Sequence, residues 1–140
     1  MKLLNFNIGD DFISAVKEDL YLDLHNDFDF TGYSCDVLKK EFKLIFRKGR
    51  AEWIQNNGIN NLAFKFKEVS FLKIQEGDSR EYPDDERCLD GIGFNTEDMR
   101  SDMDSFLASN EFHDDYDLIF TFVSGLAIKI HSKEVFLETI

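Results

Sequence analysis

The chain has 140 residues, with 28 acidic and 16 basic side chains, and a net charge of −12 at pH 7. Such a chain repels nucleic-acid backbones and anionic membrane surfaces, because both select clustered Lys and Arg. We therefore expect neither nucleic acid nor membrane as a partner. Hydrophobic residues make up 43% of the chain, and fifteen of them are Phe, which suffices for one core. A single domain over residues 1–140 is the expectation.

The sequence shows no sign of export. The longest uncharged apolar stretch, residues 118–128, is shorter than the span of about 20 residues that a membrane helix needs. The first ten residues mix Asn and Asp into their apolar run, unlike a signal-peptide core. Cys35 and Cys88 are two thiols without a disulfide framework, and we expect them to be reduced and packed. A cytoplasmic location is predicted by default.

Alternation of apolar and polar residues indicates half-buried strands, because successive side chains of a strand point to opposite faces. It recurs at residues 4–8, 20–30, 42–46 and 62–66. After residue 66 the apolar positions slip by one and then slip back, out to residue 74. A slip of this kind predicts one long strand with a β-bulge.

The last third of the chain predicts a hairpin. Alternating apolar residues at 118–122 and 126–130 flank Ser124-Gly125, a pair that tight turns accept. Residues 135–137 supply a last strand after a turn near residues 132 and 133. Seven or eight strands with short connections favour antiparallel pairing.

Two segments carry helical spacing. The first is capped by Asp10 and has its apolar side chains at Phe12, Ile13, Val16 and Leu20. The second is capped by Asn95 or Thr96 and has its apolar side chains at Met99, Met103, Phe106 and Leu107. The predicted fold class is therefore α+β: a mainly antiparallel sheet of seven or eight strands with one or two short helices.

The least regular stretch, residues 75–94, contains Pro83 and an acidic run, and it reads equally as a functional loop or as a solvated connection. Gly91 and Gly93 precede the second predicted helix. A phosphate-binding turn would need a third glycine or a lysine there, and acids follow instead. We interpret these two glycines as turn residues.

No catalytic, cofactor or metal site is predicted. His25, Asp27 and Asp29 would share the polar face of one strand, but a solvated face explains them better than a metal site. Neither cysteine lies in a nucleophile motif. A pair of Cys88 with His113 would require the fold to bring them together.

Several segments resemble a pattern in small bacterial proteins. The residues that carry the resemblance are Leu22–Phe30 with its His25-Asn26-Asp27 turn, Phe42–Phe46, Trp53 and Leu62–Val69. Those proteins are uncharacterised or of the immunity type, which is encoded beside polymorphic toxins. The resemblance covers the first half of the chain and implies a non-enzymatic protein that binds and neutralises a cognate toxin. It assigns no role to any residue.

The charge favours the same function. An acidic domain binds a basic protein rapidly through electrostatic steering, and many toxic nucleases have basic clefts. We predict a basic protein partner that contacts Asp84, Asp85, Glu86, Asp114 and Asp115. The alternatives are a small enzyme of unassigned reaction and a self-associating structural subunit; the oligomeric state stays open.

Overall fold

The computed structural model describes residues 1–54, 57–78 and 83–140. Within these ranges the chain forms ten strands and two short 3-10 turns. In chain order the elements are β1 (Lys2–Leu3), β2 (Asn7–Ile8), β3 (Ser14–Lys17), β4 (Leu20–Asp23), β5 (Phe28–Asp36), β6 (Glu41–Lys48), β7 (Asn61–Gln75), η1 (Pro83–Arg87), β8 (Leu89–Asn95), η2 (Glu97–Met99), β9 (Asp117–Phe122) and β10 (Ala127–Thr139).

Two sheets contain all of these strands. The larger has the order β5-β6-β7-β10-β9-β8, and β1 adds to β10 as a seventh strand. The smaller has the order β2-β3-β4. Every pairing is antiparallel except that of β1 with β10. The prediction of a mainly antiparallel sheet is confirmed, but neither predicted α-helix forms in the described ranges, where only η1 and η2 are helical.

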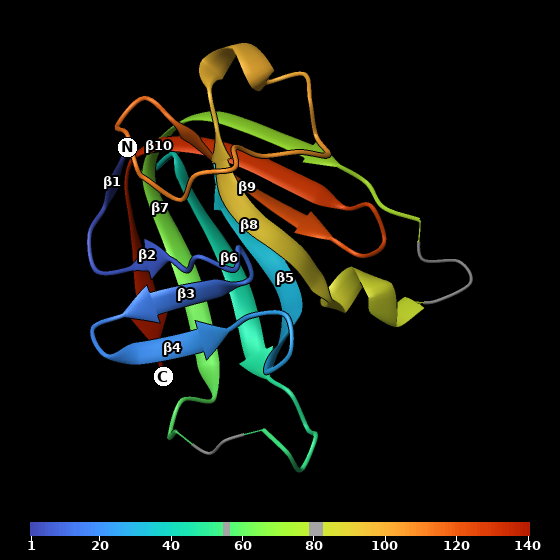
Figure 1. The fold of residues 1–140 in the computed structure, drawn as a ribbon. Helices are drawn as coiled ribbons and strands as arrows, with labels where there is room; N and C mark the ends of the chain where they lie inside the picture. The colour runs from blue at the N-terminus through green and yellow to red at the C-terminus, as the bar shows by residue number, and fades with distance from the viewer. Residues whose placement is uncertain (55–56, 79–82) are drawn as a thin grey trace.

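The large sheet curls until its two ends approach each other (Figure 1). The rings of Phe30 on β5 and Phe122 on β9 lie 4.6 Å apart, although three strands separate β5 from β9 in the sheet. The curl follows from the right-handed twist of strands and from bulges in β5 and in the β7–β10 pair. Phenylalanine rings therefore fill the inside of the curl.

The small sheet lies across one end of the curled sheet, in front of β6, β7 and β10 (Figure 1). Ile8, Ala15 and Leu22 of this sheet are fully buried in the common core. Phe6, just before β2, packs edge-on against Phe64 of β7 with 5.3 Å between ring centroids. Burying a side chain of this size contributes about 1.5–3 kcal/mol, so the small sheet is an integral part of the core.

The helix expected after Asp10 is wrong: residues 14–23 form the β3–β4 hairpin. Glu18 in its turn has φ +55°, which no α-helix accommodates. Ala15 and Leu22 lie opposite each other and are both buried. The apolar spacing suits a short amphipathic helix and one buried face of a hairpin alike, and pairing within the small sheet decides between them.

The helix expected after Asn95 is also wrong. Only Glu97–Met99 is helical, and residues 100–116 run irregularly to β9. The amino group of buried Lys129 donates hydrogen bonds to the carbonyls of Met99 and Asp102, and so ties this irregular segment to β10. Gly91 and Gly93 are not turn residues but lie inside β8, where the ring of Phe106 packs directly over them.

Two strand boundaries differ from the expectation. Residues 20–30 are not one strand, because the Asp23 carboxylate accepts the backbone N–H groups of His25 and Asn26 and closes a turn. β10 continues through Ser132 without the expected turn. By contrast, the β9–β10 hairpin and the long, bulged strand β7 are confirmed.

Candidate functional site

The open side of the curled sheet holds a groove with a volume of about 780 Å³. One wall is β5 from Asp29 to Tyr33, and the other includes η1, which packs against β5. The loop after β7 closes one end with Glu76. The groove therefore lies where the two ends of the sheet approach each other but do not pair.

Acidic side chains dominate this groove. Asp29, Glu76 and Glu86 line it together with Arg47 and Arg87, and Asp84 and Asp85 stand beside it on η1. The three carboxylates and two guanidinium groups that line the groove leave a net charge of −1, and Asp84 and Asp85 add two further carboxylates on the adjoining η1. Arg87 lies 3.9 Å from Asp84 in an exposed pair, which contributes little energy. The groove is suited to a cationic ligand.

The five acids predicted to bind a partner fall into two separate groups. Asp84, Asp85 and Glu86 are on η1, at the groove. Asp114 and Asp115 are exposed in the loop before β9, where the chain's amino terminus donates a hydrogen bond to the Asp114 carbonyl. Figure 1 shows η1 and the amino terminus at opposite sides of the molecule, so one compact ligand cannot contact both groups.

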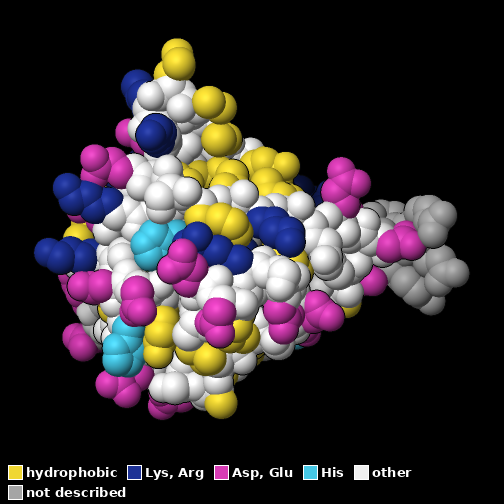
Figure 2. Space-filling view, turned by 90° about the horizontal axis from the view of Figure 1, so that it is seen from above, with side chains coloured by type: hydrophobic (Ala, Val, Ile, Leu, Met, Phe, Trp, Pro, Cys, Tyr) yellow, Lys and Arg dark blue, Asp and Glu magenta, His cyan; other side chains and the backbone are white. Residues whose placement is uncertain are grey.

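The tip of the β5–β6 hairpin is unusually apolar for an exposed turn. Val37 is 79% exposed and Leu38 is 95% exposed. Next to them a hollow of about 550 Å³ is lined by apolar side chains that include Phe42 and Leu72. Figure 2 shows hydrophobic side chains gathered toward one projection of the molecule, whereas acidic side chains are scattered over the rest of that face. This tip extends the β5 wall of the groove.

A fully buried carboxylate, that of Asp117, has a structural role. Asp117 is fully buried and accepts two hydrogen bonds from Arg100, at 2.8 Å from Nε and 3.0 Å from Nη2. Its Oδ1 also lies 3.1 Å from His131 Nδ1. Arg100 in turn covers the ring of Phe71, 4.1 Å from the centroid. All of these groups are engaged with one another, and the network joins the 96–116 segment to the sheet.

Cys88 meets His25 rather than His113. His25 Nδ1 lies 3.5 Å from the Cys88 sulfur and 2.5 Å from the carbonyl oxygen of Leu89. The carbonyl can only accept, so Nδ1 carries a proton and is no base for the thiol. Burial, followed by the fields of three carboxylates, raises the pKa of Cys88 above its ordinary value; the carboxylates are Asp85, Asp90 and Asp29. This pair lacks the features of an activated nucleophile.

The predicted convergence of His25, Asp27 and Asp29 on one strand face does not occur, since His25 lies in the turn before β5. Among the residues that the structure describes, no group of three or more His, Cys, Asp or Glu side chains is arranged to hold a metal ion.

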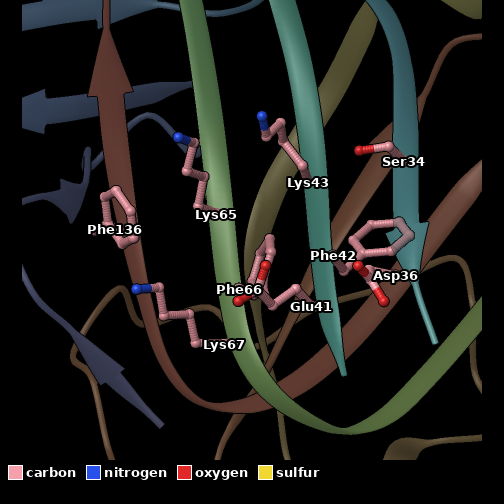
Figure 3. A pocket seen from close by; sticks show the side chains of 9 residues that line it. All are labelled: Ser34, Asp36, Glu41, Phe42, Lys43, Lys65, Phe66, Lys67 and Phe136. Atoms are coloured by element: carbon pink, nitrogen blue, oxygen red, sulfur yellow. The ribbon is translucent and has the colours of Figure 1, made fainter. Parts of the chain in front are cut away.

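The outer face of the sheet carries a second charged surface (Figure 3). Lys43 and Lys65 lie directly opposite each other on β6 and β7. The ring of Phe136 lies between the amino groups of Lys65 and Lys67, 5.7 and 5.5 Å from its centroid. Acids balance these lysines: Lys65 forms an ion pair with Glu138, and Asp36 and Glu41 line the same hollow. This face has three lysines against three carboxylates, whereas carboxylates are in excess at the groove.

Comparison of the chain with protein-family models, curated proteins and solved structures found no match. Within residues 1–54, 57–78 and 83–140, no helix has the length and apolar character needed to cross a bilayer.

Sequence reasoning found only part of this groove. The acidic run at residues 84–86 was predicted to contact a partner, and these residues lie on η1. Asp29 was predicted only to lie on the polar face of a strand. No sequence pattern predicted that Glu76 and Arg47 belong to a binding site, because their neighbours in the groove are distant in sequence. The curl of the sheet brings them together.

Proposed function

We propose that this protein is a non-enzymatic binding protein that holds a basic protein partner in the groove between β5 and η1. The observation that supports this proposal most is the excess of carboxylates around that groove, on the unpaired side of the sheet. Opposite charges steer encounter and fix the orientation of docking, which suits a chain with a net charge of −12.

The most specific form of this proposal is an immunity protein that neutralises a basic bacterial toxin in the cytoplasm. The resemblance of the first half of the chain to immunity-type proteins supports it, and so does the acidic groove, which complements the basic cleft of a nuclease. The arrangement of Cys88 and His25 and the engaged state of Asp117 weigh against the enzyme alternative.

The test compares two variants with the same change in net charge. Glu76→Lys with Glu86→Lys reverses the groove, whereas Asp114→Lys with Asp115→Lys changes the loop before β9. Each variant and the wild type are immobilised and exposed to extract of the source cell at low and high salt. Retained proteins are identified by mass spectrometry, and their affinity is then measured.

We expect a basic protein on the wild type and on the loop variant, released by salt, and at least about tenfold weaker binding to the groove variant. An equal loss of affinity in both variants would show that net charge alone is responsible, and would contradict binding in the groove. A partner that binds independently of salt would contradict the electrostatic basis of the function.

A further inference from the structure

The two edges of the large sheet differ in their backbone hydrogen bonds to the rest of the chain. At the β8 edge, Ile92 donates its N–H to the Phe12 carbonyl, and Leu107 donates to the Phe94 carbonyl. Loops therefore cover that edge. At the other edge β5 pairs only with β6, and η1 packs against it. Within the described residues no backbone group outside the β5–β6 ladder is hydrogen-bonded to the backbone of residues 28–36. An uncovered edge of this kind accepts another strand.

The register shows which groups of β5 are free. The N–H of Gly49 donates to the Asp27 carbonyl, on the β5 side, and the N–H of Lys48 donates to the Asn60 carbonyl, on the β7 side. Successive residues of a strand point their backbone groups to opposite sides. Odd-numbered residues of β6 are therefore hydrogen-bonded to β5, and even-numbered residues to β7. Tyr33 and Cys35 lie opposite Leu44 and Phe42. Their backbone N–H and C=O groups consequently point away from β6, in a stretch where residues 33–36 are exposed.

Side chains beside this edge indicate which kind of segment would bind there. The acidic groove begins at the same strand, with Asp29 on β5 and Glu86 across from it. Tyr33 adds an exposed aromatic ring that stacks on Phe42, with 5.4 Å between centroids. An extended segment with alternating basic and apolar side chains would meet carboxylates with one kind of side chain and this ring with the other.

We propose that the basic partner binds by adding an extended segment as a strand to the free edge of β5. This inference rests on the proposed function and specifies how the groove recognises its partner. A second copy of the chain is a poorer occupant, because it carries the same net charge of −12 and would be repelled. Main-chain hydrogen bonds supply affinity, and the groove supplies selection for positive charge.

The test uses a defined probe, a short peptide of alternating Lys and Val, and a twin with the same sequence that is methylated at successive backbone nitrogens. Methylation removes the strand's donors and keeps its charge. We expect the unmethylated peptide to bind at least about tenfold more tightly, because the twin loses several ladder hydrogen bonds. Binding is followed by fluorescence anisotropy at low salt.

Hydrogen exchange on the wild-type protein provides the second measurement. The amides of Tyr33 and Cys35 should exchange more slowly when the unmethylated peptide is bound, whereas the amide of Ser34, which faces β6, should change little. Cys35→Pro should weaken peptide binding, because proline removes an outward donor without breaking the β5–β6 ladder, and Cys35→Ala is its control.

The outcomes separate the two proposals. Equal binding of both peptides, with Tyr33 and Cys35 unprotected, overturns strand addition and leaves binding in the acidic groove standing. No binding of either peptide overturns both. Protection of Tyr33 and Cys35 that grows with protein concentration alone, together with a dimer in light scattering, assigns the edge to a second copy and overturns the basic partner.

Discussion

Arg100 and Asp117 form a two-pronged ion pair in which the carboxylate is fully buried and the guanidinium covers Phe71. Arg100 follows η2 directly, and Asp117 is the first residue of β9. The pair thus fixes both ends of the irregular segment to the sheet. The hydrogen bonds and charge of Asp117 also raise the pKa of Arg100.

Removing Arg100 should destabilise the protein strongly. Arg100→Leu leaves the Asp117 carboxylate buried with His131 as its remaining side-chain partner, and breaking a buried pair in this way costs about 3–5 kcal/mol. Urea denaturation measures the loss. The exposed pair of Arg87 with Asp84 is the control, and Arg87→Leu should cost less than about 1 kcal/mol. Adding Asp117→Asn to Arg100→Leu should recover stability; if it does not, the buried charge is not the cause.

Gly93 should not tolerate a methyl group. A Cβ at this position would lie 2.5 Å from Cδ2 and 2.6 Å from Cγ of the Phe106 ring. Gly93→Ala should cost about 1–3 kcal/mol, because overpacking displaces the ring from β8. Thermal unfolding of Gly93→Ala in a Phe106→Ala background provides the control. There the added methyl group should cost little, and an undiminished cost would assign the effect to the strand backbone instead.

Cys88 should react slowly with iodoacetamide. Only the thiolate reacts, and burial with nearby carboxylates raises the pKa of this thiol. Rates measured on Cys35→Ala and Cys88→Ala, which keep one thiol each, should show the exposed Cys35 reacting faster. Asp85→Asn should accelerate Cys88 by weakening the negative field. A Cys88 that outpaces Cys35 at neutral pH would indicate an activated nucleophile and favour the enzyme alternative.

Lys129 should make stability depend on alkaline pH. Burial lowers its pKa from the ordinary 10.5, so in the window between the lowered value and 10.5 the unfolded chain binds more protons than the folded one. The contribution of Lys129 to stability therefore increases as the pH rises through that window. The free energy of unfolding of wild type, relative to Lys129→Met, should grow toward pH 10.5.

The matched substitution Lys67→Met removes an exposed ammonium group and controls for the loss of one positive charge. A difference between wild type and Lys129→Met that stays constant with pH would show that Lys129 carries its ordinary pKa in the folded protein.

The sequence by itself determined the strands whose one face is buried. In β6 and in most of β7 and β10, apolar residues recur at every second position because the core takes one face of each strand. The turn at Ser124-Gly125 was equally legible, since Gly125 has φ +91° and glycine accepts that geometry at little cost. The charge of the chain was also determined by composition alone.

Tertiary structure decided the remainder, because the responsible contacts join residues that are distant in sequence. Residues 14–23 form a hairpin because Ala15 and Leu22 are buried together in the core, and Lys129 on β10 binds the carbonyls of Met99 and Asp102 in the irregular segment that begins at η2. His25 meets Cys88 across 63 residues. The groove exists because the twist of the sheet brings β5 toward η1 without pairing them, and no local pattern encodes the distance between the two ends of a curled sheet.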